Sequence, residues 1–151
     1  MNLEQLFEAW RANCAINARL LALCADEDFE LKPGKGKTIR SNWVHIVGVR
    51  RAHLEESFRK EASLVPKLDW KTATRIEIEE GLRSTDELVE RLFRRIEEEG
   101  KPARWTAPRF FGYSVAHEAH HRSQIEIALR INGREMPDGE MYGLWEAWST
   151  R

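Results

Sequence analysis

The sequence has few features that would tie the chain to a membrane, a polyanion or an export route. No apolar run approaches the roughly 18 residues that a membrane span requires, and a formal net charge of −1 leaves no basic excess for nucleic acid. The N-terminal segment MNLEQLFEAW carries acidic residues where a signal peptide would carry basic ones. We therefore expect a cytoplasmic protein with no nucleic-acid partner and no membrane partner.

Cysteine is also scarce, which excludes a fold that depends on several disulfide bonds. The only two cysteines, Cys14 and Cys24, fall in one expected helix. At a rise of about 1.5 Å per residue they are separated by about 15 Å, which is too far for a disulfide bond between them. We expect both to act as small buried hydrophobic residues.

The chain does have the composition of a globular protein. Hydrophobic residues make up 42% and charged residues 32% of its 151 residues. A chain of this length can bury a sizeable core, so we expect residues 1–151 to form one domain. Apolar residues recur at spacings of three and four positions, which predicts amphipathic helices.

Four helices are predicted between breaker residues. They cover residues 2–25, 38–60, 84–99 and 106–132. The third is expected to begin at Ser84, because Ser84-Thr-Asp-Glu87 has the pattern of a capping box. Residues 72–81 are ambiguous, since IEIE alternates like a strand. Gly133 is a suitable left-handed residue at the end of the last helix. The sequence predicts an all-α four-helix bundle with up-down-up-down topology.

Tryptophan is plentiful, with six residues. Most are expected in the core of the bundle, and Trp43 and Trp105 are candidates for an aromatic wall around a pocket. The C-terminal segment MYGLWEAW predicts a short helix or an extended strap, whose Trp145 and Trp148 would cover the bundle.

The strongest chemical pattern is a pair of histidines on the last predicted helix. His117 and His121 are four positions apart, so they lie about 40° apart around the axis and one turn apart along it. Two imidazoles so placed can reach one metal ion. A helical wheel puts both, with Gln124, in the stripe that faces the core, and puts Arg122 on the far side. Buried imidazoles are costly unless their polar atoms are satisfied, and a metal ion satisfies them.

A third ligand is expected from another helix. His45 lies in WVHIVGV, the apolar middle of the second helix. Taken alone, such a histidine is more often a hydrogen-bonded structural residue than a ligand. Its occurrence with a buried HxxxH pair favours a three-histidine site. Three neutral imidazoles suit Zn²⁺, Ni²⁺ or Fe²⁺ and leave a coordination position open to water or substrate.

Other patterns are weaker. Glu118 points about 100° away from His117, so it is not expected to act as a metalloprotease base. His53 lies about 12 Å along the helix from His45 and is expected at the surface or an interface, and His120 is expected to be partly exposed. The segment 34–38, GKGKT, resembles the end of a phosphate-binding loop but lacks its first glycine and a preceding strand.

With these motifs in place, the chain resembles the DinB-like superfamily of small four-helix metal-binding proteins. The resemblance covers nearly the whole chain and lies in NWVHIVGVRRAH, HEAHHRSQIEIALRINGREMP and LWEAW. The family's last helix carries a His, three residues, a second His, then Arg, usually Gly, and Gln, and here Ser123 replaces the glycine. The resemblance implies that His45, His117 and His121 hold a divalent metal, and it implies a frequent homodimer.

The same resemblance predicts the metal-binding site more firmly than it predicts the reaction that the protein would catalyse. The family includes S-transferases and isomerases that use low-molecular-weight thiols such as bacillithiol or mycothiol, and many members of unknown activity. Our first hypothesis is a metal-dependent transferase or hydrolase acting on a small electrophile, with Gln124 or Arg122 orienting the substrate and an external thiol as a possible nucleophile. The second is a non-catalytic stress-response module that binds metal or a small ligand. The third is a plain dimeric bundle with buried histidines.

Overall fold

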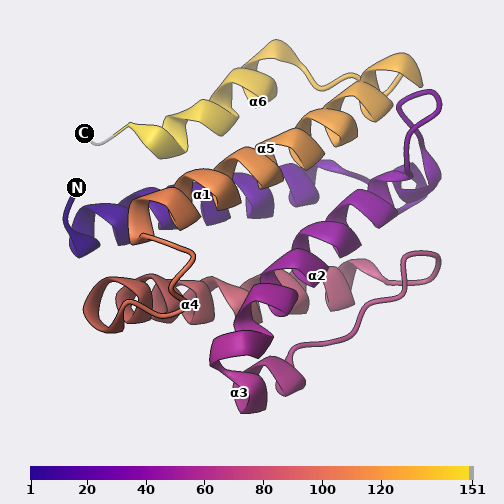
Figure 1. Ribbon diagram of the computed structural model, residues 1–151. Coiled ribbons are helices and arrows are strands. Elements are labelled where there is room, and N and C mark those ends of the chain that lie inside the picture. The colour runs from indigo at the N-terminus through magenta and orange to yellow at the C-terminus, as the bar shows by residue number, and fades with distance from the viewer. Residues whose placement is uncertain (150–151) are drawn as a thin grey trace.

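The computed structural model describes residues 1–149, and every regular element in that part of the chain is helical. The longest helices are α1 (Leu3–Leu23), α2 (Ile39–Ser57), α4 (Arg75–Glu99) and α5 (Ala107–Ile131). The shorter ones are η1 (Asp26–Glu30), α3 (Arg59–Leu64), α6 (Asp138–Gly143) and η2 (Leu144–Trp148). Figure 1 shows α1 and α5 lying alongside each other. Helix α2 packs on α5 and α4, and α4 also packs on α1. The all-α class is confirmed, and the up-down-up-down order stays a prediction.

The first and last long helices end close to their predicted positions. Asn2 caps α1 through a capping box in which Asn2 and Gln5 exchange hydrogen bonds of 2.9 and 3.0 Å between side chain and backbone. Thr106 precedes α5, and Pro108 occupies its first turn, where the missing N–H costs nothing. Gly133 adopts φ +75° just beyond α5, as predicted from its freedom to enter the left-handed region.

The predicted start of the third helix is wrong. Helix α4 begins at Arg75, and its capping box is formed by Thr74 and Glu77. Ser84 lies inside the helix, where its hydroxyl donates to the carbonyl of Gly81 at 3.3 Å. The alternation in IEIE does not mark a strand, since the side chain of Ile78 is fully buried while Ile76 is 76% exposed. Residues two positions apart share one face of a strand but not of a helix, and here only Ile78 faces the core.

The second predicted helix is interrupted before its expected end at residue 60. Phe58 has φ −137° and ψ 57°, which are not helical angles, and it separates α2 from the short α3. Helices α2 and α4 approach each other closely at Gly81, where an added Cβ would lie 2.8 Å from Cγ1 of Val47. A glycine there permits the helix contact at a modest cost in helix propensity.

The core is divided into two apolar clusters with a polar layer between them. One cluster surrounds Trp43, and the other surrounds Trp10. Each long helix contributes apolar residues to both clusters and one or two polar residues between them. The layer consists of Asn13 and Asn17 on α1, Arg50 on α2, Thr85 on α4, and Glu118 and Arg122 on α5. All six side chains are buried, so their polar groups must find partners within the protein.

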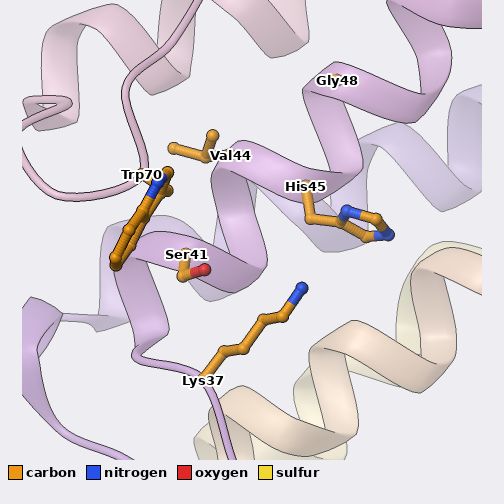
Figure 2. Close-up of a pocket in the computed structure, with 6 residues that line it drawn as sticks. All are labelled: Lys37, Ser41, Val44, His45, Gly48 and Trp70. Atoms are coloured by element: carbon orange, nitrogen blue, oxygen red, sulfur yellow. The ribbon is translucent and has the colours of Figure 1, made fainter.

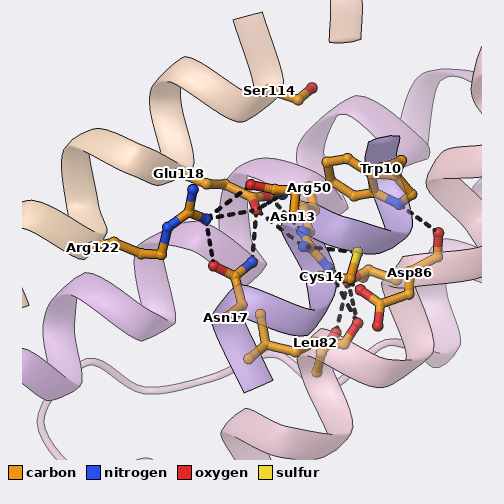
Figure 3. Close-up of polar contacts among 12 residues, drawn as sticks. Trp10, Asn13, Cys14, Asn17, Arg50, Leu82, Asp86, Ser114, Glu118 and Arg122 are labelled. Atoms are coloured by element: carbon orange, nitrogen blue, oxygen red, sulfur yellow. Dashed lines mark hydrogen bonds and ion pairs between the residues drawn. The ribbon is translucent and has the colours of Figure 1, made fainter. Parts of the chain in front are cut away.

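Glu118 is at the centre of this layer (Figure 3). Its carboxylate accepts from Arg50 at 2.6 and 3.1 Å, from Asn13 at 2.6 Å and from Asn17 at 2.7 Å. The guanidinium of Arg50 also donates to Thr85 on α4 at 3.0 Å. A single buried carboxylate therefore links α5 directly to α1 and α2, and through Arg50 to α4.

Arg122 corrects the helical-wheel assignment. The wheel placed it on the side away from the core, but its side chain is only 7% exposed. Its Nη1 donates to the side-chain oxygens of Asn13 at 2.9 Å and Asn17 at 2.6 Å. The wheel failed because α5 is buried against α1 as well as α2, which a single apolar stripe does not represent.

Glu118 and Arg50 stabilise each other's ionised forms. Burial opposes ionisation of Glu118, but the charge of Arg50 and the hydrogen bonds from Arg50, Asn17 and Asn13 outweigh it, so its pKa is lowered. Burial likewise opposes the charge on Arg50, but the charge and hydrogen bonds of Glu118, helped by the charge of Asp86, outweigh it, so the pKa of Arg50 is raised. The pair is held ionised inside the protein.

No helix within residues 1–149 is both long enough and apolar enough to cross a membrane.

Replacing Glu118 with glutamine is expected to destabilise the fold strongly. Glu118→Gln keeps the shape of the side chain but removes the buried negative charge, and it leaves Arg50 with the half-exposed Asp86, 2.6 Å away, as its remaining ion-pair partner. We expect the free energy of unfolding of the metal-free protein to fall by about 3 kcal/mol, as measured by urea denaturation. The control Glu97→Gln alters an exposed glutamate of α4 and should change stability by less than about 0.5 kcal/mol. Equal stability of E118Q and the parent would show that the layer is not essential.

Candidate metal centre

Helices α2 and α5 bring His45, His117 and His121 together. One ring nitrogen from each histidine can be chosen so that all three lie within 4.8 Å of one another. The ring centroids are separated by 4.6 Å for His45 and His121, 4.7 Å for His117 and His121, and 5.2 Å for His45 and His117. The three histidines singled out from the sequence are thus one spatial cluster.

The cluster has the donor set and nearly the spacing that a metal ion requires. Ligand nitrogens about 2.1 Å from a tetrahedral ion lie about 3.4 Å apart, so small side-chain rotations would close the cluster around an ion. Burial, followed by the charges of His117 and His45, lowers the pKa of His121 to about 4. Burial is also the main cause of the lowered pKa of His45 and of His117. The imidazoles are therefore neutral near pH 7, which is the form that binds metal.

Asn42 orients one of the three rings. Its side-chain oxygen lies 2.8 Å from Nδ1 of His121, and its side-chain nitrogen donates to the carbonyl of Thr38 at 2.9 Å. The second bond fixes the amide so that its oxygen faces the imidazole, and Nδ1 of His121 must then carry the proton. The lone pair of His121 is left on Nε2. An oxygen that accepts from the outer nitrogen is a regular feature of metal-binding histidines.

Aromatic side chains border the cluster at the end nearer the start of α5. Tyr113 stacks on His117 with ring centroids 5.9 Å apart, and Trp105 lies 5.3 Å from Tyr113. His53 packs against the rings of Trp105, Tyr113 and Phe110 and is not a member of the three-histidine group. Trp105 thus belongs to an aromatic wall that reaches the cluster through Tyr113, whereas Trp43 lies in the core.

A cavity of about 550 Å³ opens beside His45. Its lining consists of Lys37, Ser41, Val44, His45, Gly48 and Trp70 (Figure 2). Most of these residues lie along one side of α2, and Trp70 comes from the loop before α4. The cavity is large enough for a small molecule next to the imidazole of His45.

The remaining predicted site residues lie elsewhere. Arg122 is held in the polar layer by α1, so its position does not favour a role in orienting a substrate beside His45. Gln124 is half-buried and lies near the loop before α2, where its Oε1 would be 3.5 Å from a Cβ added to Gly36. Glu118 faces Arg50, in agreement with the expectation that it is not a metalloprotease base. His120 is exposed.

The C-terminal helices lie away from the histidine cluster. Figure 1 shows α6 running alongside α5 and α1, and η2 packs on α1. The predicted short C-terminal helix is present and packs on α1, and its Trp145 and Trp148, 67% and 37% exposed, cover the bundle only in part. They line a separate cavity of about 290 Å³ against α5. Among the described residues, none of this segment lines the cavity beside His45.

Comparison with known protein families identifies the family of the chain. The model of the DinB family matches residues 1–151, the whole chain. The chain belongs to the DinB family. No curated protein and no solved structure matches it. The resemblance inferred from HxxxH and the mid-helix His45 is thereby confirmed at the level of the family.

Three residues around the DinB-family site were missed by sequence reasoning. Asn42 could have been found, because it lies three positions before His45 in a buried stretch and must therefore face nearly the same way. Lys37 was seen only as part of a poor phosphate-binding loop. Trp70 has no helical pattern around it, and only tertiary structure brings its loop to the cavity.

The role of Asn42 can be tested without any metal. In the metal-free protein we expect His121 to be the Nδ1–H tautomer, as seen in a long-range ¹H–¹⁵N spectrum of the histidine rings near pH 7.5. Asn42→Leu removes the acceptor and should lose this tautomer preference. Ser41→Ala, which alters a neighbouring residue of the cavity, should keep it. An Nε2–H tautomer in the unsubstituted protein would contradict the assignment.

Proposed function

We propose that this DinB-family protein binds one divalent transition metal through His45, His117 and His121 and uses it to catalyse a reaction of a small electrophile. The observation that carries the proposal is the cluster of three neutral imidazoles next to an accessible cavity. The family match and the hydrogen bond from Nδ1 of His121 to Asn42 support it further. Zn²⁺, Ni²⁺ and Fe²⁺ all suit such a donor set.

The protein would contribute a rigid three-point site. His117 and His121 share one face of α5, and His45 approaches from α2, so ligands on two packed helices would fix the position of the ion. A bound divalent ion lowers the pKa of a coordinated water or thiol and so supplies a nucleophile at neutral pH. The cavity at His45 would hold the electrophile beside that position.

The chain's own thiols are poor candidates for the nucleophile. Burial strongly raises the pKa of Cys14, and the charge of Arg50 offsets this only in part. Burial, together with the charge of Asp28, raises the pKa of Cys24 to about 12. Both thiols stay protonated near pH 7 and are correspondingly unreactive. This supports a reaction in which an external low-molecular-weight thiol, or water, attacks the substrate.

Metal analysis tests the first part of the proposal. Protein purified without a histidine tag is expected to hold about one metal ion per chain by elemental analysis. His117→Ala should lose most of this metal and the rise in melting temperature that metal loading produces. The matched control His120→Ala removes an exposed neighbouring histidine and should keep both. If H117A retains its metal content and melting temperature, the three-histidine site is wrong.

Turnover tests the second part. Metal-loaded protein is expected to accelerate the attack of a small thiol on 1-chloro-2,4-dinitrobenzene, with formation of a carbon–sulfur bond and release of chloride and a proton, or else the hydrolysis of 4-nitrophenyl acetate. His45→Ala should reduce the rate by about 100-fold or more, since losing a ligand costs more than losing an orienting partner. Stoichiometric metal binding with no turnover in either assay would favour a non-catalytic binding module.

The homodimer implied by the family resemblance stays a prediction. Apolar residues on α5 and on the C-terminal helices are exposed in the single chain and would suit such an interface. They are Ile127, Ile131, Tyr142 and Trp145.

A further inference from the structure

Lys37 is directed at the candidate metal centre. Figure 2 shows its side chain extending from the loop before α2 toward the ring of His45. Lys37 and His45 line the same cavity. The ammonium group of Lys37 therefore lies on the side of the three-histidine cluster that borders the cavity.

The loop that carries Lys37 is held in place by packing. A Cβ added to Gly36 would lie 2.6 Å from Cγ of Pro33, so only glycine fits without a shift of the loop. It would also lie 3.5 Å from Oε1 of Gln124, which shows that the loop rests on α5. The loop is thus positioned by the same helix that carries His117 and His121.

The segment that resembles the end of a phosphate-binding loop leads directly into the N-cap of α2. Oγ1 of Thr38 accepts from the backbone N–H of Ser41 at 3.1 Å, so the first turn of α2 is capped by its own side chain. The lysine that looked like part of a phosphate-binding motif is instead directed along the side of α2 toward His45.

The cavity beside His45 has a positive character. None of its six lining residues is acidic, and Lys37 forms no ion pair with any residue in the range 1–149. The closest acidic residue in sequence to Trp70 is Asp69, whose carboxylate is occupied by the backbone N–H groups of Lys71 and Thr72 at 2.7 and 3.1 Å. A second cation, Lys71, lies 4.8 Å from the ring of Trp70.

The opposite part of the cavity is apolar and flat. The indole of Trp70 is 57% exposed and lines the cavity with Val44. Gly48 leaves room there, since a Cβ added to it would meet nothing within 4 Å. A planar group could pack against this wall while a charged group reaches Lys37.

We propose that the cavity selects small substrates in which a carboxylate is attached to a flat apolar body, with Lys37 binding the carboxylate and Trp70 packing on the body. This inference rests on the proposed metal function, because it places the reacting group of the substrate at the three histidines. Lys37 and Trp70 are specificity-determining residues in this scheme.

A pair of matched thiols tests the inference. The probes are 3-mercaptobenzoate and its neutral analogue 3-mercaptobenzamide, whose meta geometry prevents both groups from binding one metal ion. Dissociation constants are measured in cobalt-loaded protein from the thiolate-to-cobalt absorption, and in metal-free protein from amide shifts in NMR spectra. We expect both forms of the protein to bind the carboxylate about fivefold more tightly than the amide, with a smaller preference at high salt.

Three variants separate the contributions. Lys37→Gln should abolish the preference for the carboxylate, whereas Lys35→Gln, which alters an exposed lysine of the same loop outside the cavity lining, should leave it intact. Trp70→Ala should weaken binding of both probes by about two- to tenfold without changing their ratio.

The outcomes distinguish the two proposals. Cobalt binding with equal affinity for the two probes, or with an unchanged preference in K37Q, would overturn the inference and leave the metal function standing. Failure to bind cobalt, together with a preference that depends on Lys37 in the metal-free protein, would overturn the metal function and support the cavity's selectivity. Failure of both measurements would overturn both.

Discussion

The buried ion pair between Glu118 and Arg50 is the constraint on which the rest of the structure depends. Charged groups this deep are tolerated only when their hydrogen-bonding capacity is filled, and four groups converge on the two oxygens of Glu118. Apolar contacts alone allow a helix to pack in several rotations about its axis. The carboxylate of Glu118 meets all its donors in only one rotation of α5. The pair therefore sets how α5 is turned and where it lies along α1 and α2.

The candidate site follows from that arrangement. Glu118 directly follows His117, and Arg50 lies on α2 not far from His45. With Glu118 turned inward to Arg50, the side chains about 100° around α5 are directed to the edge where α2 and the loop before it lie. His117 and His121 then face His45, with His121 buried and the other two half-buried. The polar layer around Glu118 fixes one side of α5, and the three histidines lie on the side that borders the cavity.

The chemical character of the molecule is divided accordingly. The thiols of Cys14 and Cys24 are on the interior side, where burial keeps them protonated. The accessible side has one cavity lined by the imidazole of His45, a lysine and an exposed indole. Such a surface suits binding of a small molecule that brings its own reactive group or is attacked by a nucleophile from solution. The C-terminal helices and their tryptophans cover a different face, so access to the histidines does not depend on them.

The sequence by itself determined the helical class, the ends of α1 and α5, and the three histidines, because these depend on local periodicity, on capping residues and on a spacing of four. It misplaced the start of α4, since the Thr74 and Ser84 segments both match a capping box and only packing of Ile78 and Gly81 against α2 decides between them. The burial of Arg122, and the meeting of Lys37 and Trp70 at His45, were decided by tertiary structure alone. Both features depend on contacts between separate elements. The periodicity of apolar residues within one helix does not indicate which other element will pack against that helix.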